Sequence, residues 1–254
     1  MKLRLLLLAL AASAILACGQ VARLIEPSPQ QLLEKANENL KAAKTTHFDG
    51  TGSISVKGGM SIAFDFTMRG DAEIPDKSRM TVEMALFGQS LNSDVITVGG
   101  KSYTKDSNAV GWKEGSGSNS SAPTSMLDPI GQMDPTTLIS VTEVDRPDVD
   151  GKPTRHLAYT IDPQKLLEQM KKATTTQIKA LNPVGKGEVW IRVDNSQIVR
   201  QLVKLSFDME GDLGLPMASG ASPAKASMEV SFDLKFSRIG DPVTPAITAP
   251  PLKR

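Results

Sequence analysis

The sequence predicts an α+β fold in which one large antiparallel sheet with a single apolar face carries a few helices. Two observations predict the sheet. Apolar and polar residues alternate over most of the chain, as they do in strands that bury one face. Gly-Gly, Asp-Gly and Asp-Asn pairs, which are typical of hairpin turns, separate several of the alternating segments. A third observation predicts the helices, because two segments show instead the apolar spacing of a helix.

The N-terminus is typical of an exported bacterial lipoprotein. Two cations precede the apolar run Leu5–Leu16, which is shorter than the roughly 20 residues that a membrane-spanning helix needs. The following segment, Ile15-Leu16-Ala17-Cys18-Gly19, resembles a lipobox. That resemblance implies cleavage before Cys18 and a lipid on its thiol. The alternative is an ordinary secretory signal with an incidental cysteine.

Composition argues against several classes of function. Cys18 is the only cysteine, so no intramolecular disulfide can form. His47 and His156 are the only histidines, and a zinc or copper centre is therefore not expected. With 29 basic and 28 acidic residues, the chain is nearly neutral and has no basic stripe for nucleic acid. We predict no cofactor and no nucleic-acid partner.

Catalytic patterns are also missing from the sequence. Neither histidine accompanies a nucleophile motif, and no glycine-rich phosphate-binding motif occurs. A glycosidase-type pair of carboxylates is left open by the sequence, but no aromatic-rich sugar cleft accompanies the acidic residues. We therefore predict no catalytic residue and do not expect an enzyme.

The globular part is expected to begin with a helix. Ser28 can cap it, because Pro29 would stand at the first helical position and Gln31 would complete a capping box. The positions that recur at helical spacing are Leu32, Leu33, Ala36, Leu40 and Ala43. An amphipathic helix of this kind must pack on another apolar surface. A second helix should follow Asp162, with its apolar side formed by Leu166, Leu167 and Met170.

Strands are expected between the two helices and again after the second. Short helical pieces are expected at Ser125–Gln132 and Asp134–Ser140. A hairpin around Asp150-Gly151 should join Val141–Val149 to Pro153–Ile161. The other clearly alternating segments are Phe48–Val56, Met60–Met68, Met80–Leu86, Asp94–Val98, Lys101–Lys105, Val189–Val193, Val199–Met209 and Met228–Phe236.

The apolar face of such a sheet exceeds what the predicted helices can cover. About nine or ten strands of about nine residues make a sheet of roughly 45 by 30 Å. Each long helix covers only about 22 by 10 Å. Every large apolar side chain left in water forgoes roughly 1.5–3 kcal/mol. We therefore expect this face either to hold an apolar ligand or to mediate dimerisation.

The order of the parts carries a resemblance to a known group. The first helix has the form Leu32-Leu33-x-x-Ala36-x-x-x-Leu40, and the strand Thr46–Gly52 follows it. Gly187–Asp194 and Ile198-Val199-Arg200 come late in the chain. Over residues 28–238 this order resembles the LppX/LprG lipoproteins of actinobacteria and, more distantly, the LolA/LolB lipoprotein carriers.

The resemblance implies a curved half-barrel whose helices pack on its concave face around a hydrophobic cavity. It also implies that the cavity binds acylated lipids, glycolipids or lipopeptides and that the protein assists their transfer. Its candidate lining consists of the inward positions of the helices and strands. These are Leu33, Ala36, Leu40, Ile54, Phe64, Phe66, Met80, Val82, Met84, Leu166, Met170, Val203, Leu205, Phe207, Val230, Phe232 and Leu234.

Four segments are therefore expected: a signal peptide (1–17), a lipidated N-terminus and linker (18–29), an LppX/LprG-like domain (30–240) and a Pro-rich tail (241–254). Cys18 would anchor the protein on the extracytoplasmic face of the cell membrane, where an envelope transport partner could meet it. The alternative is a structural, sensor or chaperone lipoprotein that docks a protein partner through the apolar sheet face.

Overall fold

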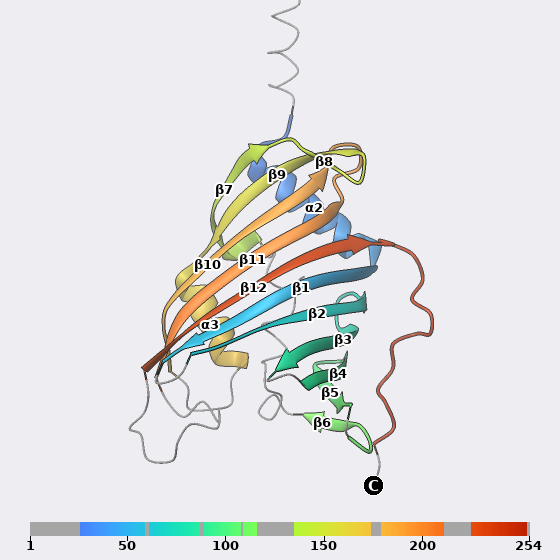
Figure 1. Cartoon of the computed structure of the whole chain (residues 1–254). Coiled ribbons are helices and arrows are strands. Elements are labelled where there is room, and N and C mark those ends of the chain that lie inside the picture. Colours follow the sequence, from blue (N-terminus) through green and yellow to red (C-terminus); the bar gives the residue numbers. More distant parts are fainter. Residues whose placement is uncertain are drawn as a thin grey trace, which may run out of the picture.

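The computed structural model describes residues 26–58, 61–86, 89–107, 109–115, 135–173, 179–210 and 225–252. Its strands form one twelve-stranded sheet with the order β6-β5-β4-β3-β2-β1-β12-β11-β10-β9-β7, and β8 pairs with β9 beside this path. Figure 1 shows the sheet as a single twisted layer. The sheet is open because its described end strands, β6 and β7, lie at opposite edges. The predicted large antiparallel sheet is confirmed.

The two halves of the chain meet in the middle of this sheet. The first half runs as a meander of neighbouring strands: β1 (Thr45–Lys57), β2 (Ser61–Glu73), β3 (Lys77–Leu86), β4 (Gln89–Val98), β5 (Lys101–Asp106) and β6 (Lys113–Gly115). The second half contains β7 (Leu138–Asp145), β8 (Asp148–Val149), β9 (Lys152–Ile161), β10 (Lys179–Arg192), β11 (Ile198–Glu210) and β12 (Lys225–Ser237). Strands β1 and β12 pair antiparallel, with Gly50 opposite Leu234.

The first described helix, α2 (Pro29–Ala43), begins as its sequence predicts. The Ser28 hydroxyl accepts a hydrogen bond from the Gln31 amide at 3.2 Å, and the Gln31 side chain accepts one from the Ser28 amide at 3.0 Å. At the other end Lys44 has a left-handed backbone with φ 65° and donates to the Lys41 carbonyl. The predicted capping box is confirmed.

The apolar face of the sheet and the helices share one core. Leu33, Ala36 and Leu40 of α2 are buried together with inward side chains from β1 to β4, β7 and β9 to β12. Helix α2 packs against β1, β7, β10 and β11, whereas α3 (Pro163–Ala173) packs against β10 and contributes Leu166. Both helices therefore lie on the half of the sheet that runs from β1 to β7.

Three local predictions were wrong. Asp134–Ser140 is not a helix, because only Pro135–Thr137 forms a 3₁₀ turn before β7 begins at Leu138. The predicted hairpin partner Val141–Val149 is divided between β7 and the short β8. Strand β10 begins ten residues before Val189, because its early part pairs with both β11 and the end of β9.

The C-terminal tail follows the ends of the strands. Ile247 is only 2 % exposed, and its amide donates to the Glu73 carboxylate at 2.9 Å. The Arg79 guanidinium donates to the Pro245 carbonyl, and Leu252 forms a bridge with Trp112 beside β6. Figure 1 shows the tail descending from β12 towards β6. The irregular, Pro-rich segment thus connects the middle of the sheet to its edge.

Candidate functional site

The structure brings the predicted cavity residues together on one face. All but Met170 lie in or against the same core cluster, with Phe64 and Met84 partly buried at its margin. The side chain of Met170 falls outside the described residues, as do the signal segment and Cys18. The inward parity of the strands is therefore correct, whereas the assignment of these residues to a ligand cavity stays a prediction.

Coverage of this face by the described helices is uneven. The contacts of α2 and α3 fall mainly on β1, β7, β10 and β11. The apolar face continues into the other half of the sheet, where Met80 and Val82 of β3 and Val95 of β4 are buried. The apolar face thus extends beyond the strands on which these two helices mainly pack.

A polar pair lies inside this apolar surface. Gln201 of β11 is 0 % exposed, and its side-chain amide donates to the Tyr159 hydroxyl of β9 at 2.9 Å. The two side chains meet across β10 at Gly187, where a Cβ atom would stand only 2.1 Å from the Tyr159 ring. Burial raises the pKa of Tyr159 to about 12, so the phenol stays neutral at neutral pH.

Two buried amide oxygens have no hydrogen-bond partner among the described residues. They are Gln201 Oε1 and Asn37 Oδ1, and Asn37 on α2 is 3 % exposed. Sequence reasoning missed both residues because it searched the inward positions for apolar side chains. The sequence could have indicated Gln201, because this polar residue has the same inward parity as Val203 and Leu205 on its strand.

The opposite face of the sheet is polar and closely paired. The Trp190 ring stacks on His156 with 4.1 Å between ring centroids, and the Arg200 guanidinium lies 4.5 Å from the Trp190 ring centroid. Arg200 also pairs with Asp233, while His156 lies between Asp145 and Glu188. This row joins five strands, β7 and β9 to β12, and stabilises the sheet rather than presenting a free nucleophile.

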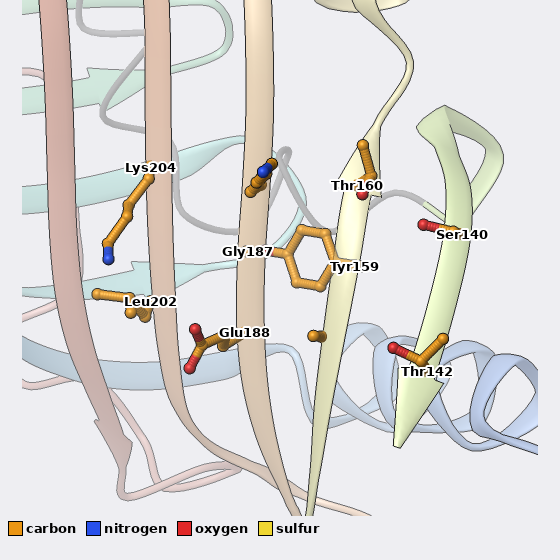
Figure 2. A pocket seen from close by; sticks show the side chains of 10 residues that line it. Ser140, Thr142, Tyr159, Thr160, Gly187, Glu188, Leu202 and Lys204 are labelled. Atoms are coloured by element: carbon orange, nitrogen blue, oxygen red, sulfur yellow. The ribbon is translucent and has the colours of Figure 1, made fainter. Parts of the chain in front are cut away.

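Two hollows of the described surface lie on this polar face. One of about 300 Å³ is lined by residues of β7, β9, β10 and β11. Figure 2 shows Thr160, Glu188 and Lys204 around it, with the Tyr159 ring beside Gly187. Another, of about 640 Å³, lies over β1, β2 and β3 and includes Asp65, Glu83 and Asp233. Both combine polar and apolar lining, which differs from the predicted hydrophobic cavity.

A cluster of ion pairs fixes the start of the domain to the sheet; we call it the linker clamp. It consists of Glu26, Pro27, Glu143, Arg146 and Arg155. Arg146 pairs with both Glu26 and Glu143 at 2.5 Å, whereas Arg155 pairs with Glu143 and donates to the Pro27 carbonyl at 2.9 Å. Burial acts to raise the pKa of Glu143, but hydrogen bonds from Arg146 and Arg155 outweigh it and hold that pKa below its usual value.

The linker clamp predicts a pH dependence of stability. Because the pKa of Glu143 is lower in the folded than in the unfolded chain, its contribution is complete above the unfolded value and disappears as the pH falls through the folded value. We expect Glu143→Gln to lower the melting temperature at pH 7, and we expect this difference from wild type to shrink as the pH falls below the usual pKa of a glutamate. The exposed Glu38→Gln is the control in thermal melts across this range. If the melting temperatures of wild type and Glu143→Gln differed by the same amount at every pH, ionised Glu143 would not be the source of the stabilisation.

Within the described residues no group of histidine, cysteine and carboxylate side chains is placed to hold a metal ion. Nor does the described part of the chain contain a helix of the length and apolarity that crossing a bilayer requires.

Comparison with known proteins gives a likeness at the level of the fold. No family model and no curated protein matches the chain. Among solved structures, LppX of Mycobacterium tuberculosis aligns with 14 % identity over 86 % of this chain and 97 % of its own, with a TM-score of 0.44. LprF of Mycobacterium bovis aligns with 13 % identity over 88 % and 99 %, with a TM-score of 0.45.

The chain is similar to mycobacterial lipoproteins. A LolA superfamily protein of Nitrosomonas europaea also aligns, with 12 % identity over 88 % of this chain and 99 % of its own and a TM-score of 0.33. The structural comparison thus returns the LppX and LolA groups that the sequence resembles.

Proposed function

We propose that this chain is a non-enzymatic, membrane-anchored lipoprotein that binds acylated lipids or lipopeptides on its apolar sheet face and assists their transfer in the cell envelope. The signal peptide, the lipid on Cys18 and an extracytoplasmic location are parts of the same proposal. They rest on the sequence of residues 1–19.

The observation that carries the proposal is the extent of the apolar face. Inward side chains from β1 to β4 and from β9 to β12 belong to one core, while the described helices pack mainly on β1, β7, β10 and β11. An acyl chain is an apolar partner that suits such a face, because it buries apolar area without needing hydrogen bonds of its own. The hollows on the opposite face combine polar and apolar lining.

Lipid carried through purification is the direct test. We expect organic extracts of the purified, non-acylated protein, expressed without residues 1–18, to contain acylated lipid by mass spectrometry. Extracts of the same protein unfolded and washed on the affinity resin provide the control. The refolded protein should bind a fluorescent dodecanoyl probe with saturation. An extract without lipid, combined with no probe binding, would favour the alternative in which the apolar face docks a protein partner.

A further inference from the structure

We propose that Gln201 and Asn37 form a hydrogen-bonding subsite within the lipid-binding face, which selects acyl ligands that carry an amide N–H or a hydroxyl group. The inference rests on the proposed function and specifies the ligand more narrowly. It starts from two side-chain oxygens that are buried in the core and have no hydrogen-bond partner among the described residues.

Unpartnered buried acceptors need a reason in a folded protein. Leaving such a group without a hydrogen bond destabilises the folded chain, and most buried polar groups are therefore paired. Gln201 has only its amide nitrogen engaged, with the Tyr159 hydroxyl at 2.9 Å. Its oxygen is left as an acceptor on the face against which α2 packs.

Helix α2, which packs on the apolar face of the sheet, supplies the second unpaired oxygen through Asn37. Asn37 is buried with Leu33, Ala36 and Leu40, whereas Asn39 on the same helix donates to the Asn195 carbonyl in the β10–β11 turn at 3.1 Å. The Asn39 hydrogen bond places α2 beside the start of β11. Gln201 follows Ile198 as the next buried position of that strand. Asn37 and Gln201 therefore belong to the interface between α2 and the strands beneath it.

The chemistry of the free atoms defines the ligand. Both are amide oxygens, which accept hydrogen bonds and cannot donate them. A matching ligand must bring a donor, such as the N–H of an amide-linked acyl chain or the hydroxyl of a hydroxylated one. An ester-linked chain of the same length brings only acceptors and would leave both oxygens unpaired. Because both residues are buried, the ligand must displace the groups that cover them to reach these oxygens.

Two matched probes test the subsite. Each carries a dodecanoyl chain and the same fluorophore, joined by a secondary amide in one probe and by an ester in the other. We expect wild type to bind the amide probe about 2- to 10-fold more tightly, which is the range expected from one net hydrogen bond. Gln201→Met combined with Tyr159→Phe, and separately Asn37→Leu, should bring this ratio close to one without weakening ester binding.

Stability and a control variant separate this role from a structural one. Because each set of substitutions removes an unpaired buried oxygen, neither should lower the melting temperature. Gln197→Met makes the same chemical change in the β10–β11 turn and should leave the probe ratio unchanged.

Three results would overturn the subsite. The first is equal binding of the two probes by wild type. The second is an amide preference that survives the substitutions, and the third is a crystal structure with a water molecule on Gln201 Oε1 together with an unchanged ratio. Wild type that binds neither probe would overturn the proposed function, and the subsite with it.

Discussion

Val82→Arg is expected to abolish uptake of an acyl probe while leaving the protein folded. Val82 is buried on β3, in the half of the apolar face that lies away from the strands contacted by α2 and α3. A guanidinium group there cannot be left in an apolar contact with an acyl chain, because burying an unpaired charge costs several kcal/mol. The long side chain should instead reach water and occupy the path of the ligand.

The matching control is Asn92→Arg, which adds the same side chain on the polar face of β4, opposite Glu83. Saturation binding of the dodecanoyl probe should fall below detection for Val82→Arg and stay at the wild-type level for Asn92→Arg. Circular dichroism establishes that both variants are folded. A folded Val82→Arg protein with unchanged uptake would remove β3 from the binding face.

Phe232→Asp is expected to have the largest effect on stability. Phe232 is buried in the centre of the sheet on β12, where it lies between Gly52 of β1 and Val203 of β11. Truncation of a buried phenylalanine alone costs about 3–5 kcal/mol. A carboxylate without a partner adds a desolvation penalty. The total is comparable with the 5–15 kcal/mol by which domains are generally stable, so the variant should be largely unfolded at 25 °C.

Urea denaturation measures this directly, with Phe232→Leu as the conservative control. Leucine keeps the position apolar and should lower the free energy of unfolding by only about 1–2 kcal/mol. Phe232→Asp should also lose all probe binding, since the sheet that carries the apolar face would no longer form. A cooperative transition near the wild-type midpoint would show that β12 does not hold the two halves of the sheet together.

Local rules explain what could be predicted from the sequence. Helix α2 is encoded by neighbouring residues, because Ser28 and Gln31 satisfy each other's backbone and the apolar positions recur at one spacing. The inward strand positions follow equally from period-two alternation. Strand β7 lacks that regularity because its pairing with β9 shifts register at two places, and its residues Ile139 and Val144 are exposed at the sheet edge.

Other features depend on partners far apart in the chain. Residues 179–188 contain Pro183 and two glycines, so local propensity favours a loop, yet pairing with β9 and β11 holds much of them in a strand. A glycine is needed at position 187 because the ring of Tyr159, 28 positions earlier, occupies the space that a side chain would take. The polar pair of Tyr159 and Gln201 forms across that glycine. No alternation rule nominates such a pair.

The linker clamp limits how far the domain can travel. If Cys18 carries the lipid anchor, the chain is held again at Glu26, so only eight residue steps span the distance from bilayer to sheet. Their greatest contour length is about 28 Å. The domain would therefore stay close to its own membrane, with the β7–β9 edge nearest the lipid surface. Transfer of the lipid to a more distant layer of the envelope would then need an acceptor that comes within reach of the tethered domain. Loss of the Arg146 ion pairs should lengthen that reach.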